Sequence, residues 1–308
     1  MSIRVTFWGV RGSIPVPGPT TVKYGGNTAC LELRFGTADR LIIMDLGSGV
    51  RELGGLIMKK DLKRGPINAK IFLTHTHSDH IMGFPFFTPI FIPGTTLDIY
   101  GPVSYEEDTL DRIVGDQLRY RYFPVRLEEL QATINYFQLK EGSLDLGEGL
   151  KVTTKYLNHP ILVLGYRFEF EGKTFCTAYD HEMFRNVFDV KPGDPGYDPA
   201  AVKEGELAAR EENEKVQQFY QGADLLVHDT QYTHKEYLAG KQGWGHSSFE
   251  YAINAANRAG VKHLVLFHHE PLRNDRELEG LHRAYVSAIR GKTRMKVTLA
   301  QEGTTIEV

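Results

Sequence analysis

Cysteine is scarce in this sequence, which contains only Cys30 and Cys176 among its 308 residues. Both cysteines lie inside apolar segments. A chain of this length with so few cysteines is not a disulfide-stapled scaffold. We therefore expect two buried, reduced thiols rather than a disulfide or a pair of metal ligands.

Long apolar runs are also absent, and no stretch reaches the length that spans a bilayer. The N-terminus lacks the pattern of a signal peptide, because residues 3–8 alternate apolar and polar side chains as a strand does. These absences argue against a membrane protein and against a secreted one. We expect a cytoplasmic protein.

An excess of charge of one sign is missing as well. The chain has 36 Lys and Arg against 39 Asp and Glu, which gives a formal net charge of −3. This balance excludes a global basic field for nucleic acid, although a local basic patch stays open. The hydrophobic content of 41% is an ordinary globular value that supports a substantial core. Length alone leaves one or two domains open.

What the sequence does contain is a dense cluster of metal-ligand side chains. The apolar run 69–73 is followed by Thr-His-Thr-His-Ser-Asp-His, which places His75, His77, Asp79 and His80 within six residues. A loop that leaves the end of a strand can fold such residues around one point. A mixed set of imidazole and carboxylate suits zinc, manganese or iron. The alternative is a solvated, histidine-rich turn.

More ligand-type residues downstream disfavour that alternative. His159, Asp180 and His268 each close a short apolar or β-branched run. Such positions are where the sheet of an α/β protein offers side chains to a cleft. Together with the first cluster they make seven candidate ligands. Seven are too many for one tetrahedral ion and suit two ions.

The order of these residues resembles the metallo-β-lactamase superfamily, whose signature His-x-His-x-Asp-His is followed by His, Asp and His. The resemblance runs from the first predicted strand to the last residues. It implies a first ion held by three imidazoles: His75, His77 and His159. It implies a second ion held by a carboxylate and two imidazoles: Asp79, His80 and His268. Asp180 would bridge the two divalent ions, which we expect to be zinc, with manganese or iron as alternatives.

Two further motifs resemble the phosphodiesterase branch of that superfamily, which includes ribonuclease Z and the cyclic phosphodiesterase of phosphonate breakdown. His-Asp-Thr at 228–230 follows an apolar run, and Gly-His-Ser-Ser at 245–248 precedes a helical segment. Asp229 stands where that branch commonly has Glu. The segments that resemble bacterial members of the branch lie at 7–13, 24–28 and 267–271. The Gly/Pro-rich arm with which ribonuclease Z grips tRNA is not evident here.

Asp79, Asp229 and His246 are the candidate catalytic residues. His246 directly precedes the capping-box pattern Ser247–Glu250, which opens a predicted helix at 249–259. The N-terminus of that helix favours an anionic substrate. We expect His246 to hydrogen-bond a phosphoryl oxygen or to protonate the leaving group, and Asp229 to orient His246 or a metal ligand. The alternative for His246 is a structural histidine.

Four other residues are candidates for supporting roles. Arg11 and Asn27 lie in glycine-containing loops and could reach a phosphate of the substrate, with a surface salt bridge as the alternative. His269 is a further substrate candidate, although it faces away from His268 if the backbone stays extended there. Asp45 resembles an aspartate of the family that accepts the free N–H of a ligand imidazole and fixes its orientation.

The succession of apolar runs predicts two packed sheets with helices outside, an αββα sandwich of the α/β class that forms a single domain over residues 1–308. Helices are expected near 50–59, 104–118 and 249–259. Strands are expected at 3–8, 28–35, 40–45, 69–74, 96–100, 150–157, 162–170, 173–179, 224–229, 262–267 and 295–300.

Two excursions from this core are expected. The aromatic stretch 84–131 starts right after the metal-ligand loop and builds either a wall of the cleft or part of the core or of a subunit interface. A homodimer is therefore left open. The stretch 190–216 begins with Pro-Gly-Asp-Pro-Gly and ends in a charged helical segment. It forms either a lid or a solvated loop and helix.

We predict a hydrolase with two divalent metal ions, in the first place a phosphodiesterase that acts on a small, cyclic nucleotide-like substrate. The small substrate follows from the mildly acidic charge and the missing arm, which both argue against nucleic acid. The alternatives are hydrolysis of a lactone, β-lactam or thioester at the same centre, and ribonuclease Z-like cleavage at the 3′ end of tRNA. An oxidoreductase of the flavodiiron type is disfavoured because that branch usually has Glu where His77 stands.

Overall fold

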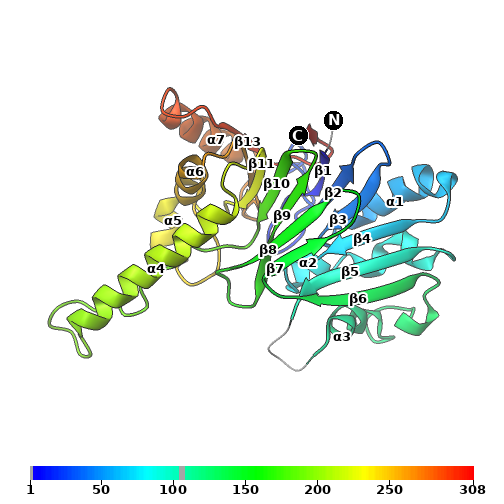
Figure 1. Cartoon of the computed structure of the whole chain (residues 1–308), viewed down its shortest axis with the longest axis horizontal. Helices are drawn as coiled ribbons and strands as arrows, with labels where there is room; N and C mark the ends of the chain where they lie inside the picture. The colour runs from blue at the N-terminus through cyan, green and yellow to red at the C-terminus, as the bar shows by residue number, and fades with distance from the viewer. Residues whose placement is uncertain (1–2, 104–107) are drawn as a thin grey trace.

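The computed structural model describes residues 3–103 and 108–308, which form two seven-stranded sheets packed face to face (Figure 1). The first sheet consists of β1 (Ile3–Gly9), β2 (Cys30–Phe35), β3 (Arg40–Met44), β4 (Asn68–Phe72), β5 (Thr96–Pro102), β6 (Thr133–Leu139) and β14 (Thr305–Glu307). The second consists of β7 (Gly142–Asp145), β8 (Lys151–Leu157), β9 (Val163–Phe170), β10 (Lys173–Ala178), β11 (Leu225–Asp229), β12 (His263–Phe267) and β13 (Lys296–Leu299).

The space between the sheets is filled by large apolar side chains from both of them. Phe7 and Phe72 of the first sheet and Phe168 and Phe267 of the second belong to one buried cluster. Every second residue of β1 is buried, as the alternation in its sequence predicts. Burial of this apolar surface is the main term that holds the two sheets together.

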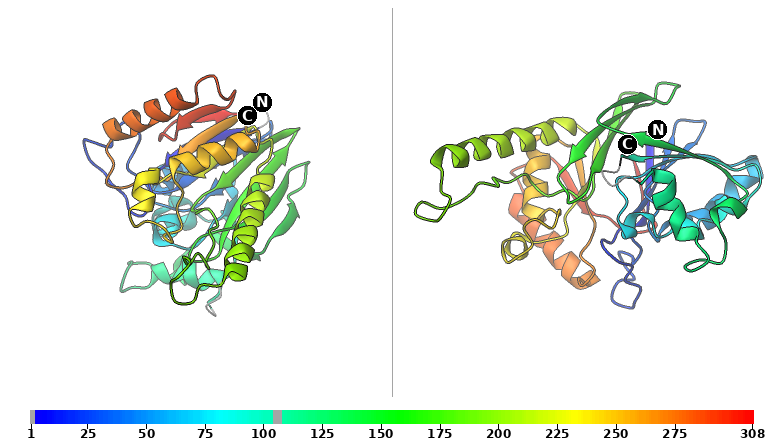
Figure 2. Two further views of the ribbon diagram at one scale, coloured as in Figure 1. Left: turned by 90° about the vertical axis from the view of Figure 1, so that its left-hand side faces the viewer. Right: turned by 90° about the horizontal axis from the view of Figure 1, so that it is seen from below.

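Helices cover the outer face of each sheet (Figure 2). The α-helices are α1 (Val50–Lys60), α2 (Ser78–Ile81), α3 (Leu110–Gly115), α4 (Pro199–Phe219), α5 (His234–Leu238), α6 (Phe249–Arg258) and α7 (Asp275–Ile289). The 3₁₀ turns are η1 (Leu62–Arg64), η2 (Phe84–Phe86), η3 (Thr88–Phe91), η4 (Asp116–Leu118) and η5 (Leu127–Glu129). The predicted αββα sandwich is confirmed. The two cysteines are free and buried, as expected.

Strand polarity explains where the candidate ligands gather. The first sheet has the order β14-β1-β2-β3-β4-β5-β6 and the second β13-β12-β11-β10-β9-β8-β7. The runs β3–β6 and β10–β13 are parallel. The carboxyl ends of parallel strands meet at one edge of a sheet. The residues that follow β4, β10, β11 and β12 therefore lie at the same end of the sandwich.

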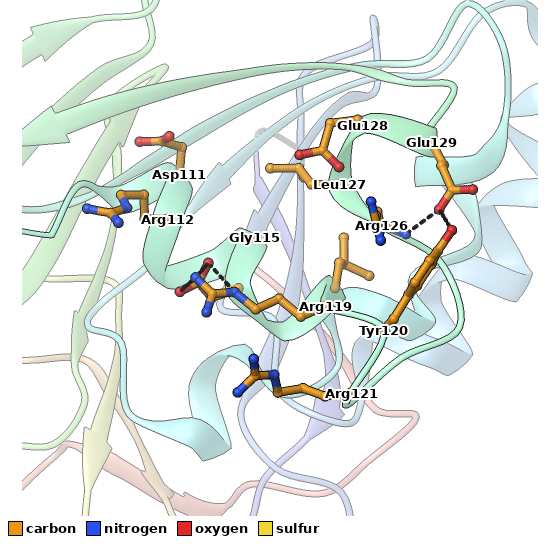
Figure 3. A pocket seen from close by; sticks show the side chains of 12 residues that line it. Asp111, Arg112, Gly115, Arg119, Tyr120, Arg121, Arg126, Leu127, Glu128 and Glu129 are labelled. Carbon is orange, nitrogen blue, oxygen red and sulfur yellow. Dashed lines mark hydrogen bonds and ion pairs between the residues drawn. The ribbon is translucent and has the colours of Figure 1, made fainter.

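The excursion at 84–131 divides into two parts. Phe84 and Phe87 are completely buried against the helix side of the first sheet, as the core-packing alternative predicts. Tyr120 is 56% exposed and lines a surface pocket of about 1000 Å³ whose other side chains are mostly charged (Figure 3). None of the seven candidate ligands lines this pocket. Of the helix predicted at 104–118, residues 104–107 lie outside the described residues, and α3 accounts for the middle of the remainder.

The excursion at 190–216 consists of a loop and most of α4, and Figures 1 and 2 show both extending away from the two sheets. Asp198 caps α4 by accepting a hydrogen bond from the Ala200 backbone N–H. Val216 and Phe219 anchor the other end of the helix in the core. The arrangement matches a solvated loop and helix, and a lid role stays a prediction. No helix in residues 3–103 and 108–308 has the length and apolar character needed to cross a membrane.

Candidate metal centre

The histidine-rich segment changes backbone conformation at His77. This residue is extended, with φ −61° and ψ 151°, and it immediately precedes the short helix α2. His75 and His80 are completely buried, and Asp79 is 6% exposed. The switch from extended to helical backbone brings the four candidate ligands of this segment into two groups that share one neighbour, Asp180.

Within each group the ligand atoms lie within 4.8 Å of one another. The first group is His75, His77, His159 and Asp180, and the second is Asp79, His80, Asp180 and His268. They are the same two sets that the resemblance assigns to the two ions. Asp180 is the residue common to both sets.

The two carboxylate oxygens of Asp180 face different groups. Oδ2 lies 3.5 Å from His75 Nε2 and 3.9 Å from His159 Nε2. Oδ1 lies 3.3 Å from both His80 Nε2 and His268 Nε2. A carboxylate oriented in this way can offer one oxygen to each of two cations.

Three buried polar atoms without a partner in the described part of the chain indicate that these residues fit divalent cations. His75 Nε2, His80 Nε2 and Asp180 Oδ1 are buried and have no hydrogen-bond partner among the described residues. Such orphaned atoms cost about 1–3 kcal/mol each unless something pairs with them. Burial lowers the pKa of His75 well below its ordinary value and that of His159 to about 4, which keeps both imidazoles neutral. Neutral imidazole is the form that binds metals.

The carboxylates of the centre attract positive charge, as the pKa values of the neighbouring groups show. Burial alone would lower the pKa of His80, but the carboxylates of Asp180 and Asp79 raise it well above its ordinary value. Burial alone would raise the pKa of Asp180, but the imidazoles of His268 and His80 lower it well below the ordinary range. These residues therefore suit a dinuclear metal site. The identity of the metal does not follow from the donor set.

Three residues of this centre have a strained backbone. Among the described residues, Asp45 (φ 58°), Asp180 (φ 39°) and His268 (φ 60°) adopt positive φ angles, which non-glycine residues rarely do. Such conformations cost about 1–3 kcal/mol each and persist where surrounding contacts over-determine them. The strain turns each carboxylate or imidazole toward its partners at the end of a strand.

Asp45 lies against His80, one of the candidate ligands. Its Oδ2 lies 2.8 Å from His80 Nδ1, and its Oδ1 accepts a hydrogen bond of 2.7 Å from the Thr74 backbone N–H. The Thr74 hydroxyl also donates to Oδ2 at 2.8 Å. Because a carboxylate accepts hydrogen bonds, the Asp45 contact places the proton of His80 on Nδ1 and leaves Nε2 for the centre.

His268 is oriented by two residues that sequence analysis did not single out. Its Nδ1 lies 3.2 Å from Oε1 of Gln231, which follows Asp229 by two positions. A Cβ on Gly12 would lie 2.3 Å from Cε1 of His268, so only glycine leaves room for the imidazole. Gln231 lies two residues beyond the end of β11, but an amide at such a position has no characteristic spacing. The contact could not be read from the sequence.

Asp229 and His246 form a buried polar pair beside the centre. Asp229 Oδ2 lies 3.0 Å from His246 Nδ1 and accepts a hydrogen bond of 3.1 Å from the Ser247 backbone N–H. Burial opposes protonation of the imidazole, but the Asp229 carboxylate raises the pKa of His246 to about 9. The His246 ring centroid lies 5.3 Å from that of His159 and 5.0 Å from that of His268. His246 thus neighbours one imidazole of each group.

The N-terminus of α6, next to His246, differs in one detail from the structure predicted from the sequence. Ser248 caps α6 and accepts a hydrogen bond of 3.2 Å from the Tyr251 backbone N–H. Ser247, the first residue of the predicted capping box, instead donates its hydroxyl to the His181 carbonyl oxygen. The predicted box is therefore not formed, because the serine that would start it is engaged by a neighbouring loop.

Glu182 organises the loop that leads to His246, and sequence analysis missed it. This residue is 2% exposed. Its carboxylate accepts hydrogen bonds from the Tyr237 hydroxyl (2.7 Å) and from the backbone N–H groups of Gly243 (2.9 Å) and Gly245 (2.8 Å). The Gly245 carbonyl oxygen lies 2.9 Å from His159 Nδ1 and so accepts its proton. A Cβ on Gly245 would lie 2.2 Å from the same nitrogen. Glu182 therefore positions the peptide that orients a candidate ligand.

Glu182→Ala is expected to weaken metal binding about 10–100-fold, the range typical of residues that orient a ligand. The change leaves two buried N–H groups unpaired and frees the peptide that holds His159. Glu182→Gln keeps one accepting oxygen and is expected to lose less. Arg185→Ala removes the ion pair between a partly exposed guanidinium group and the buried Glu182 carboxylate, which keeps its three other hydrogen bonds. This variant is expected to change affinity less than Glu182→Ala. Zinc titration of metal-free protein measures all three, and wild-type affinity in Glu182→Ala would refute the positioning role.

The three substrate candidates make contacts outside the two ligand groups. Arg11 is completely buried and donates to two loop carbonyl oxygens at 2.8 and 2.7 Å. His269 is buried and donates to the Ala300 carbonyl oxygen at 2.9 Å. The Asn27 amide donates to the Glu302 carboxylate at 3.0 Å. The structure does not bring these side chains into either ligand group, because their polar atoms tie neighbouring loops together.

The two packed sheets and the paired histidine–aspartate groups define a metal-dependent hydrolase of the metallo-β-lactamase fold. No protein-family model matches the chain. Ribonuclease Z of Lactococcus lactis subsp. lactis (strain IL1403) is 32% identical over 228 residues, which cover 65% of this chain and 70% of the relative. Ribonuclease Z of Synechococcus sp. (strain CC9311) is 27% identical over 304 residues, which cover 87% and 88%. The chain belongs to the ribonuclease Z family, in the phosphodiesterase branch of that superfamily.

Solved structures show the same fold at low sequence identity. The metallo-β-lactamase fold protein YhfI from Bacillus subtilis superposes with a TM-score of 0.62 at 19% identity and full coverage of both chains. A diphosphatase of the PhnP family gives a TM-score of 0.61 at 16% identity, with coverage of 99% and 98%. The short form of human tRNase Z gives 0.58 at 20% identity, with 99% of both chains covered.

Proposed function

We propose that this protein is an endoribonuclease that uses two divalent metal ions to cleave a phosphodiester bond at the 3′ side of tRNA precursors. Relatives named ribonuclease Z that match most of the chain support this choice over the small cyclic diester that composition favours. This proposal therefore reverses the order of the two substrates given by sequence analysis. The class of reaction, phosphodiester hydrolysis, is the same in both cases.

The observation that carries the proposal is the position of the Asp229–His246 pair. His246 neighbours His159 of one ligand group and His268 of the other. A phosphoryl group held between the two groups would therefore meet the His246 side chain. An acyl substrate such as a lactone has no comparable need for this pair, which disfavours the acyl-hydrolase alternative.

The chain's own residues divide the work as follows. The seven ligands would hold two cations, which lower the pKa of an attacking water and offset the charge that develops on the phosphoryl group. Asp229 holds Nδ1 of His246, so that Nε2 is the atom left for the substrate. Through Nε2, His246 can donate a hydrogen bond to a phosphoryl oxygen or protonate the leaving oxygen.

A small cyclic phosphodiester is the second candidate, and charge is the observation that favours it. The net charge of −3 provides no global attraction for RNA. The projecting segment 190–216 contains seven acidic and four basic residues, so it is unsuited to grip a polyanion. An RNA substrate must therefore be held by a local surface close to the centre.

Competing substrates separate the two candidates. Zinc- or manganese-loaded protein is expected to cleave a tRNA precursor with a 3′ trailer at a higher kcat/KM than 2′,3′- or 3′,5′-cyclic nucleotides, and to leave lactones and thioesters intact. Faster turnover of a cyclic nucleotide would overturn the tRNA proposal in favour of the second candidate. Turnover of a lactone or thioester without any diester cleavage would refute both.

A further inference from the structure

The loop before His246 is rigid and yet displays a large apolar side chain. Gly243 (φ 83°) and Gly245 (φ 84°) adopt positive φ angles, and Glu182 binds the backbone N–H of each. Trp244, between them, is 55% exposed. Exposing an indole on an anchored loop has no benefit for folding, because the same surface would be more stable if buried. The position two residues before His246 suggests a role in substrate binding.

A lysine accompanies the exposed indole. Lys241 Nζ lies 3.7 Å from the centroid of the Trp244 ring and 5.5 Å from that of Tyr232. The Tyr232 ring is in turn 6.0 Å from the His246 ring. Among the described residues, the contacts found for the Lys241 ammonium group are with these two rings and not with a carboxylate. An ammonium group that is held by two aromatic rings and has no counter-charge is available to an external anion.

We infer, on the basis of the proposed function, that Trp244 and Lys241 bind the nucleotide next to the scissile bond. The free face of the indole stacks on a base, and the ammonium group pairs with the adjoining phosphate. Proteins that hold single-stranded RNA combine stacking aromatic rings with basic side chains in this way, and each stacked base contributes measurably to affinity. The pair forms a local surface that is positively charged and aromatic, although the net charge of the whole chain is negative.

Tryptophan fluorescence tests the contact without any need for turnover. The sequence has two tryptophans, and the indole of the other, Trp8, donates a hydrogen bond to Glu32 at 3.0 Å. In Trp8→Phe protein treated with EDTA, a single-stranded oligoribonucleotide is expected to quench the emission of Trp244. Polyphosphate, which lacks bases, is expected to leave it unchanged. In Trp244→Phe protein the emission of Trp8 should not respond. The absence of quenching by RNA, or equal quenching by polyphosphate, would overturn the inference.

Kinetics of the metal-loaded protein provide the second test. Trp244→Ala and Lys241→Met are each expected to reduce kcat/KM for RNA about tenfold more than kcat/KM for bis(p-nitrophenyl) phosphate. Leu238→Ala, which removes a comparably exposed apolar side chain from α5, is the control and should change neither. Equal losses on both substrates would mean that the loop is only structural and would refute the inference. RNA that quenches Trp244 but is not cleaved by wild-type protein would refute the proposed function and leave the binding site standing.

Discussion

Replacing Asp180 by asparagine is expected to lower kcat/KM for phosphodiester hydrolysis by at least about 10³-fold, which corresponds to about 4 kcal/mol of transition-state stabilisation. The two carboxylate oxygens of Asp180 face different ligand groups, at 3.3 Å from His80 Nε2 and 3.5 Å from His75 Nε2. Asparagine keeps one oxygen but replaces the other with an amide group that only donates hydrogen bonds. One of the two groups would then lose its shared ligand.

Metal analysis gives this prediction a readout that does not depend on turnover. The wild-type chain is expected to bind two divalent ions, and the Asp180→Asn chain fewer. Asp98→Asn is a matched control, because Asp98 pairs with Lys70 and Asn135 on the first sheet and belongs to neither ligand group. Two tightly bound ions together with full activity in the Asp180 variant would rule out a bridging role.

Replacing His246 by alanine is expected to lower kcat for diester hydrolysis by about 10²–10⁴-fold, the range that general acid–base groups contribute. We expect this loss because Asp229 holds His246 beside both ligand groups, where it can act on the substrate. His246 clusters with Asp229 and His268, but its Nδ1 is engaged by Asp229 and it lies outside the two groups that share Asp180. The variant is therefore expected to keep both ions. Loss of kcat with an unchanged metal content would identify a residue that acts on the substrate.

Two companion variants make the His246 experiment decisive. Asp229→Asn, which weakens the hold on His246 Nδ1, is expected to reduce kcat in the same direction. His282→Ala removes a histidine of α7 that donates to the Val297 carbonyl oxygen, and it should leave kcat unchanged. An active His246→Ala protein would return His246 to the structural alternative, and loss of metal from that variant would point to a supporting role in the centre.

The strands that sequence analysis missed share a physical feature. β6, β7 and β14 are edge strands, and most of their residues are exposed or only partly buried. An edge strand that faces solvent does not need a run of apolar residues, so the pattern that marks the inner strands is weak there. The inner strands, which are buried by neighbours on both sides, were found within two residues of their bounds.

Substrate choice was the weakest inference from composition. Net charge is an average over the chain, and an average of −3 conceals a lysine placed beside an exposed tryptophan. The sequence contains Lys241 and Trp244, but only the folded loop brings the two side chains together next to His246. Composition therefore argued against nucleic acid, whereas the proposed substrate rests on relatives named ribonuclease Z and on this local surface.

The sequence by itself determined the class of fold, the kind of reaction and the identity of the candidate ligands. It could do so because metal coordination requires particular side-chain types, and because the ends of apolar runs mark the ends of strands. Only the tertiary structure decided which way each side chain points. The side chains of Arg11 and His269 donate hydrogen bonds to backbone carbonyl oxygens of neighbouring segments. The two carboxylate oxygens of Asp180 face the two ligand groups. Glu182 acts through residues about 60 positions away, and such contacts have no local pattern because packing of the two sheets and their loops creates them.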